Sequence, residues 1–209
     1  MDNDESVGMA FGTLLGEFER TKVVPEVDAY RFAKWAAAAG GKTAETLSDA
    51  AATIEAIETA TATLDDAEVP YEGRVLFVTP TTYKHIKGGV TRMVMNGENN
   101  VNYNVLIYND MRLITVPSGR FNTEITLNEP TSSSDMGGYT TTGDTMNFMI
   151  VHPSAIMQPV KHKIPRVFSP EQNQEADAWK LNYRIYHDTF VKEQKVNGIY
   201  YSAPTIISA

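Results

Sequence analysis

The chain has 209 residues, 42% of them apolar, which suits a single domain that buries its own core. Its 26 acidic and 18 basic residues give a net charge of −8, which argues against a non-specific coat on nucleic acid, because phosphate binding needs a cationic surface. The chain has no cysteine, so disulfide scaffolds, zinc fingers, iron–sulfur clusters and thiol nucleophiles are excluded.

The charge is distributed unevenly along the chain. Residues 1–70 hold 14 acidic and 5 basic residues, whereas residues 71–209 hold 12 and 13. Acids on the solvated faces of helices account for this pattern, and attraction between oppositely charged faces of two copies is the alternative. The chain contains no run of about 18 apolar residues, so no membrane-spanning helix is predicted. The acidic start from Asp2 to Glu5 is unlike a signal peptide.

Apolar residues at helical spacing predict a helix at the start of the chain. They are Val7, Phe11, Leu14, Leu15 and Phe18. The segment Val23-Val24-Pro25 is expected to end this helix and to start a second one, since proline suits the first turn of a helix. The second helix is expected to reach about Ala39 and to stop at Gly40-Gly41.

A third helix is expected over residues 46–66, with Thr46 and Asp49 forming a capping box. The apolar stripe of this helix is Leu47, Ala50, Ala51, Ile54, Ile57 and Leu64. We expect the stripe to pack on a sheet that contains residues 76–78.

From Pro70 onward the pattern changes to that of strands. Residues 74–79 form a short apolar run that predicts a buried strand, and residues 80–87 a short helix ended by two glycines. Asn109-Asp110 predicts a tight hairpin turn. The flanking strands are expected at 105–108 and 112–116, a surface loop at 131–144, and further strands at about 145–151, 156–161, 181–191 and 198–202. Helices first and strands last indicate an α+β fold.

No motif completes a catalytic site. Gly41-Lys42-Thr43 is like the end of a phosphate-binding loop, but that pattern needs glycine where Ala36 stands, so a helix terminator is the preferred interpretation. Ser118 lacks the flanking glycines of a nucleophile elbow. Glu55 and Glu58 share one helical face, where solvated carboxylates are the common case.

The histidines do not have the spacing of metal ligands. They are His85, His152, His162 and His187. The sequence therefore predicts no catalytic residue, no cofactor and no metal ion. One basic cluster, Lys161, Lys163 and Arg166, suits the acidic surface of a partner, and nucleic acid is the alternative.

Three segments of the sequence, taken together, are distributed over most of the chain. They are EFERTKVVPEVDAYRF at residues 17–32, YEGRVLFVTP at 71–80, and NFMIVHPSA at 147–155, the last continuing through 168–170, 176–188 and 195–200. Together these segments resemble the middle and the end of the major capsid proteins of tailed bacteriophages.

The resemblance implies a Hong Kong 97-like capsid fold with two lobes. Its peripheral lobe contains a long spine helix with strands, and its axial lobe carries helices on a central sheet. Residues 3–20 would be part of the spine helix, or its end. Residues 1–40 and 145–195 would then be peripheral, and residues 41–144 and 196–209 axial.

Members of this family usually begin with an N-terminal arm and an extended loop ahead of the spine helix. Here Met1 lies almost on the first predicted helix, so both segments are expected to be missing, as in a truncated form, a processed or degraded prophage product, or a short member. Cross-linking, where the family has it, uses the extended loop, so no residue here inherits that chemistry. Because the arm contacts neighbouring subunits in a shell and is expected to be missing here, we expect a monomer or small oligomer at physiological salt.

The resemblance implies a structural protein and not an enzyme: a phage or prophage major capsid subunit, or its core fragment, that self-assembles into an icosahedral shell around DNA. The implied partners are other copies, scaffold, portal or protease proteins of the phage, and packaged DNA as non-specific content, with no membrane. The implied locations are the virion capsid and the host cytoplasm. An encapsulin-type compartment shell is one alternative, and a small α+β hydrolase or ligand-binding protein is another.

The first helix needs a partner for its apolar stripe. The resemblance places strand residues Leu181, Tyr183 and Ile185, or the opposite face of that strand, against it, and another copy would cover what they leave bare. The candidate contacts between subunits are Phe11, Leu14, Phe18, Lys161, Lys163 and Arg166.

Overall fold

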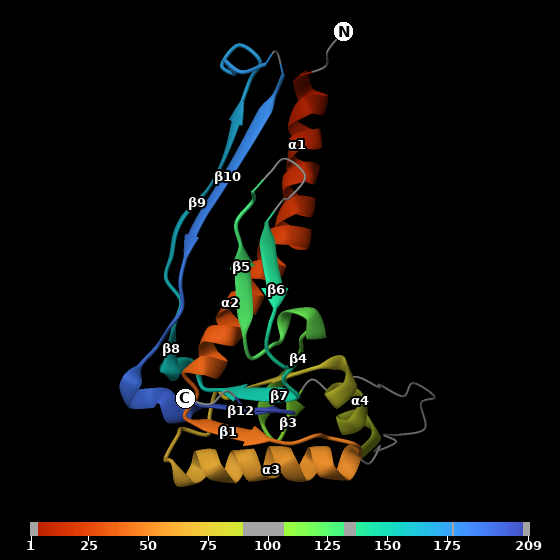
Figure 1. Ribbon diagram of the computed structural model, residues 1–209, viewed down its shortest axis with the longest axis vertical. Helices are drawn as coiled ribbons and strands as arrows, with labels where there is room; N and C mark the ends of the chain where they lie inside the picture. Colours follow the sequence, from red (N-terminus) through yellow and green to blue (C-terminus); the bar gives the residue numbers. More distant parts are fainter. Residues whose placement is uncertain (1–3, 90–106, 132–136, 177, 207–209) are drawn as a thin grey trace, which may run out of the picture.

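The structure is a computed structural model, and it describes residues 4–89, 107–131, 137–176 and 178–206 (Figure 1). One helical rod runs along the long axis of the molecule to a base made of a sheet and two further helices. The rod consists of α1 (Asp4–Phe18), a π-helical turn (Glu19–Val23) and α2 (Val24–Ala37). A ribbon of two long strands, β9 (Val160–Phe168) and β10 (Lys180–His187), extends beside the rod.

The rod is continuous where the sequence predicts a break before Pro25. Val23 and Val24 keep right-handed helical backbone angles, and the Val24 N–H donates to the carbonyl oxygen of Glu19, five residues back. Proline lacks an N–H, and in an α-helix its ring crowds the carbonyl four residues earlier. The wider π turn accommodates the proline, so the predicted break in the helical backbone is wrong. The predicted start of the second helix is confirmed, since α2 begins at Val24 with Pro25 in its first turn.

The base is built on a six-stranded mixed sheet. The pairs β1–β12 and β2–β4 are parallel, and the remaining neighbours are antiparallel. In order across the sheet the strands are β1 (Gly41–Ala44), β12 (Ile199–Ala203), β7 (Phe148–Val151), β2 (Val75–Val78), β4 (Met111–Thr115) and β3 (Ile107–Tyr108).

Alternate residues of the central strands face two different helical layers. Leu76 and Val78 share one core with Ile57 of α3 (Ala50–Asp66), and α4 (Pro80–Gly89) covers the same side. Phe77 points the other way, and its ring meets that of Phe32 on α2 at 5.2 Å. Because helices cover both faces, the strands are continuous apolar runs. The expected packing of the third helix on the strand at 76–78 is confirmed.

The third helix begins later than the predicted residue 46. It starts at Ala50, and Asp49 is its N-cap, whose Oδ1 accepts the N–H of Ala52 at 2.8 Å. Ala51, expected in the buried stripe, is exposed, and Ile54 is only half-buried.

Replacing Asp49 by alanine is expected to lower the free energy of unfolding by about 1 kcal/mol, because the first turn of α3 loses its side-chain acceptor. Ser48→Ala, one residue earlier and also exposed, is the matched control and should change stability by less than about 0.5 kcal/mol. Urea unfolding of both variants measures the difference. Equal effects would show that Asp49 does not cap the helix.

The residues after the second helix form β1, which the sequence does not predict. Gly41 opens this strand opposite Tyr200 of β12, and an added Cβ there would lie 2.3 Å from the tyrosine ring, so the position requires glycine. Thr43 and Tyr200 are joined by a hydrogen bond between their hydroxyls. The segment Gly41-Lys42-Thr43 is therefore an edge strand and not a helix terminator alone.

The turn between β3 and β4 in the six-stranded sheet is a tight hairpin. Asn109 and Asp110 have positive φ angles of 50° and 58°, which confirms the predicted hairpin.

The strands outside this sheet and outside the β9–β10 ribbon form two further two-stranded units. Residues 138–141, expected in a surface loop, pair as a strand with residues 125–128. The expected strand at 181–191 ends at His187 and is followed by a separate short strand. These units are β5 (Ile125–Asn128) with β6 (Gly138–Thr141), and β8 (Ile156–Met157) with β11 (Phe190–Val191).

The coarse α+β class is confirmed, while the assignment of residues to two lobes stays a prediction. Two elements within these stretches of sequence have the following places in the structure. Strand β7, within the stretch 145–195, lies at the centre of the sheet between β12 and β2. The β5–β6 hairpin, within 41–144, lies beside the rod (Figure 1). No helix of the described residues is long and apolar enough to cross a membrane.

Candidate assembly surface

The β9–β10 ribbon is held to the rod through one of its two faces, here called the inner face. The ring of Tyr183 on β10 meets that of Phe18 edge-on at 6.0 Å, and Lys163 on β9 pairs with Glu19 at 3.2 Å. Burial alternates along β10, so that Leu181, Tyr183, Ile185 and His187 are the more buried set. The expected packing of the first helix on these strand residues is therefore seen at Phe18.

A groove of about 730 Å³ lies between the rod, the inner face and β6. Leu14 and Phe18 line it and remain 57% and 42% exposed. Two of the predicted contact residues thus lie in one groove on the rod, available to a partner. The side chain of Phe11, a third candidate, lies outside the described residues.

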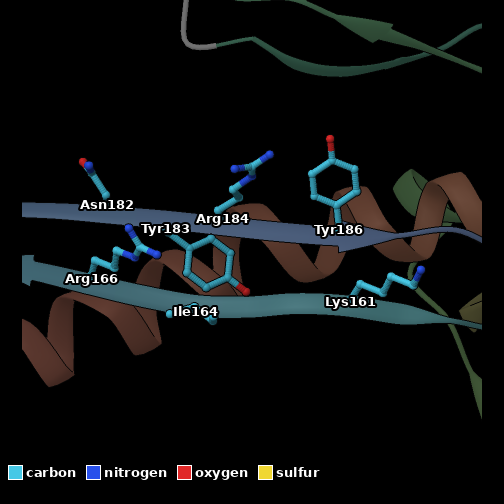
Figure 2. A pocket seen from close by; sticks show the side chains of 7 residues that line it. All are labelled: Lys161, Ile164, Arg166, Asn182, Tyr183, Arg184 and Tyr186. Atoms are coloured by element: carbon cyan, nitrogen blue, oxygen red, sulfur yellow. The ribbon is translucent and has the colours of Figure 1, made fainter.

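The opposite side of the ribbon, the outer face, is basic and aromatic. Figure 2 shows side chains of the two strands that line a hollow of about 850 Å³, with Asn182, Arg184 and Tyr186 projecting from β10 to the same side. The guanidinium of Arg184 lies 5.0 Å from the ring centre of Tyr186, which is itself exposed. The residues of the outer face are Lys161, Ile164, Arg166, Asn182, Arg184 and Tyr186.

A β-bulge decides which basic residues share the outer face. The register places Lys163 opposite Ile185 but Lys161 opposite Tyr186, so His162 is an extra residue on β9. In a regular strand Lys161 would lie on the same side as Lys163; the bulge turns it to the side of Arg166. The predicted cluster is therefore divided: Lys161 and Arg166 stay together, and Lys163 faces the rod. Arg184, which no sequence pattern singles out, completes the cluster.

The inner face carries a titratable pair where β10 ends. Burial, and then the nearby Arg31 guanidinium, lower the pKa of His187 below its usual value of 6.5. The pKa of Asp188 is also lowered, by the backbone N–H of Thr189 and by the hydroxyl of Tyr30, which donates to Asp188 Oδ1 at 2.9 Å. Both groups therefore anchor the ribbon to α2 in their unprotonated forms.

The melting temperature is expected to fall as the pH drops below about 6.5, because the unfolded chain then binds a proton at His187 more readily than the folded chain does. The stability that a lowered pKa provides is present above the unfolded pKa and is lost as pH falls through the folded one. His187→Phe keeps an aromatic ring against Tyr30 and should reduce this loss between about pH 7 and pH 5. An unchanged pH profile in calorimetry would contradict the assignment.

The residues that the sequence offers as candidates for catalysis or metal binding have structural contacts or are exposed to solvent. His152 accepts the Ser154 N–H at Nδ1, and His85 Nδ1 lies 3.2 Å from the Thr53 hydroxyl. Ser118 opens a short 3₁₀ turn, with its carbonyl accepting from Asn122. Glu55 and Glu58 are exposed on α3. Within the described ranges no three His, Asp or Glu side chains are grouped as metal ligands.

No protein-family model and no curated protein matches the sequence. Among solved structures, the chain is similar to one from Mycobacterium phage Che8, with a TM-score of 0.54 and 16% identity over 95% of this chain and 62% of that one. It is similar to a chain in the capsid structure of cyanophage P-SCSP1u, with a TM-score of 0.60 and 12% identity over 97% and 66%. A chain in the mature capsid of bacteriophage PhiM1 gives a TM-score of 0.55 and 13% identity over 97% and 65%.

The likeness extends over nearly the whole of this chain, which in turn spans 62% to 66% of the length of those solved chains. At identities of 12% to 16% such a likeness establishes the fold. The rod, the ribbon beside it and the sheet-and-helix base are therefore the architecture of chains found in phage capsid structures.

Proposed function

We propose that this protein is a structural subunit of a phage capsid, or the core of one, that associates with copies of itself into a closed shell around DNA. The observation that carries the proposal is the likeness to phage chains over 95% to 97% of the sequence. A fold shared over that length by chains of such different sequence suits a role that depends on shape and surface contacts.

The arrangement of polar groups supports a structural role over an enzymatic one. The serine, histidine and paired carboxylates that enter hydrolytic sites lie apart in the described residues, on a 3₁₀ turn, at a strand end and on an exposed helix face. Two hollows lie on the rod and on the ribbon; the walls of the first are largely apolar, and those of the second carry basic and aromatic side chains.

Several finer features belong to the same proposal. The shell is icosahedral, with the rod as spine helix of a peripheral lobe and the base as axial lobe of a Hong Kong 97-like subunit. The subunit resides in the virion, or in the host cytoplasm when a prophage is expressed, and its partners include scaffold, portal or protease proteins. DNA is enclosed content, which suits a net charge of −8 better than tight phosphate binding does.

The two alternatives receive less support. An encapsulin-type shell would share the fold, but the three solved chains described above come from phages. A small hydrolase or ligand-binding protein needs a pocket with convergent polar groups, and the groove beside Leu14 and Phe18 has largely apolar walls.

Sedimentation velocity at rising protein concentration, at low and at physiological ionic strength, tests the proposal. We expect a monomer or small oligomer at physiological salt and larger, reversible assemblies as the salt is lowered, because screening weakens contacts between charged faces. A chain that sediments as a monomer under all conditions and that turns over a small substrate would overturn the proposal.

A further inference from the structure

We infer that the outer face of the β9–β10 ribbon seats helix α3 of a second copy of this chain. The inference rests on the proposed self-association and names the two surfaces that meet in it. It differs from the contact predicted from the sequence, because Lys163 lies on the inner face, the bulge in β9 brings Lys161 to the side of Arg166, and Arg184 of β10 joins them.

The outer face has an excess of positive charge that is not balanced by ion pairs with the described residues of its own chain. Among the described residues, the ion pairs do not include Lys161, Arg166 or Arg184, whereas Lys163 on the inner face pairs with Glu19. The hollow between these cations is about 850 Å³, and exposed apolar groups of Ile164 and Tyr186 line it. A concave, cationic face with apolar patches suits the convex surface of an amphipathic acidic helix.

Helix α3 presents such a surface. Its apolar side, which includes Ile57 and Leu64, is buried against the sheet. Its exposed side carries Glu55, Glu58 and Asp66 at i, i+3 and i+11, which lie on one stripe of a helix. None of these three acids enters an ion pair within the described part of the chain.

The middle of this acidic stripe is filled by small neutral side chains. Thr59 and Ala62 lie between Glu58 and Asp66, and both are exposed. Ala62 is seven residues after Glu55 and four before Asp66, which places it on the same stripe. The backbone of α3 can therefore approach a concave partner closely between its two charged ends.

The two charged rows match in length. Eleven residues of helix separate Glu55 from Asp66, about 16 Å at 1.5 Å per residue. On the ribbon, Lys161 and Arg166 lie opposite Tyr186 and Asn182, four residues apart on β10, or about 13 Å. A helix laid along the ribbon therefore brings each row of charges within reach of the other.

The contact requires a second copy. The outer face lies on the ribbon that extends along the rod, whereas α3 lies at the far side of the base (Figure 1). A surface that meets a different surface on the next copy is heterologous, and such contacts form rings when the rotation between copies closes and open filaments when it does not. The phosphates of DNA are the other ligand for a cationic face, but the length match and the acidity of the N-terminal third favour the protein partner.

Disulfide trapping tests the inference, since the chain has no cysteine of its own. Ile164→Cys places a thiol at the centre of the outer face, and Ala62→Cys places one within the acidic stripe, without removing any charge. The two single-cysteine proteins are mixed at low salt, oxidised and scored for mixed dimers on a non-reducing gel. The matched control is Val167→Cys, on the same strand but on the opposite face, with 45% exposure against 47% for Ile164.

We expect mixed dimers from Ile164→Cys with Ala62→Cys, and about tenfold fewer with Val167→Cys. Reversing two charges, Arg166→Glu and Arg184→Glu, should lower trapping about tenfold, and Glu58→Lys with Asp66→Lys on the partner should restore it. Circular dichroism verifies that each variant folds.

The remaining outcomes separate this contact from the proposed function. Equal trapping at residues 164 and 167, or no trapping in a chain that associates in sedimentation, would overturn the contact and leave self-association standing. A chain that never associates would overturn both. If the charge reversals abolish retention of duplex DNA but leave trapping unchanged, the outer face binds phosphate and the inferred contact is wrong.

Discussion

Replacing Arg74 by alanine is expected to lower the free energy of unfolding by about 2–4 kcal/mol, because a buried side chain is lost and the carbonyl groups that accept its hydrogen bonds lose their donor. The Arg74 side chain is fully buried at the start of β2, and its guanidinium pairs with Asp65 at the end of α3 at 2.7 Å. It also donates to the carbonyl oxygens of Val69 and Pro70, at 2.6 and 3.1 Å. One side chain thus fastens the last turn of α3 and the following loop to the sheet.

Chemical denaturation of Arg74→Ala measures this effect, with Arg112→Ala as the matched control. Arg112 lies on β4 opposite Val75, in the neighbouring strand, but is exposed, so its removal should change stability by less than about 0.5 kcal/mol. Equal, small effects of the two substitutions would show that the buried guanidinium is not required to hold α3 on the sheet.

Replacing Ile57 by alanine is expected to cost about 2–4 kcal/mol, because it leaves a cavity between α3 and the sheet. Ile57 has no exposed surface, and it packs in the cluster that contains Leu76 and Ile150. Ile54→Ala on the same helix is the control. Ile54 is half-buried, so the same change there should cost about half as much.

Thermal and urea unfolding of both isoleucine variants measures the difference. The sequence alone predicts two similar losses, since both residues fall on the predicted apolar stripe. A loss at Ile54 as large as that at Ile57 would contradict the observed start and rotation of the helix, which place one residue inside and the other at the margin.

The elements that could be predicted from the sequence are those with a strong local pattern. The apolar run at 75–78 and the turn Asn109-Asp110 predict the strand and the hairpin that the structure contains. Strand β1 could not be predicted, because its four residues alternate weakly and pair with β12, more than 150 residues later. Local sequence does not report such a partner, and the neighbouring glycines suggest only the end of a helix.

The rod and the ribbon show two further limits of local patterns. A proline such as Pro25 ends or kinks most helices, and no local pattern predicts the π turn that continues the helix past it here. The bulge at His162 reverses the faces of the residues before it, so strict alternation gives the wrong neighbours for Lys161. The candidate contact residues were therefore predicted in part: the basic stretch is an exposed strand, but its division between two faces depends on a register that only the paired strand defines.

The central claim is that copies of this chain form a closed shell, and electron microscopy of negatively stained protein tests it most directly. Protein concentrated at low ionic strength should give rings or curved closed particles whose repeating unit is an elongated subunit with a rod and a base. Raising the salt should disperse them, because the charged faces are then screened. A uniform field of single-chain particles at every concentration and ionic strength would contradict the claim.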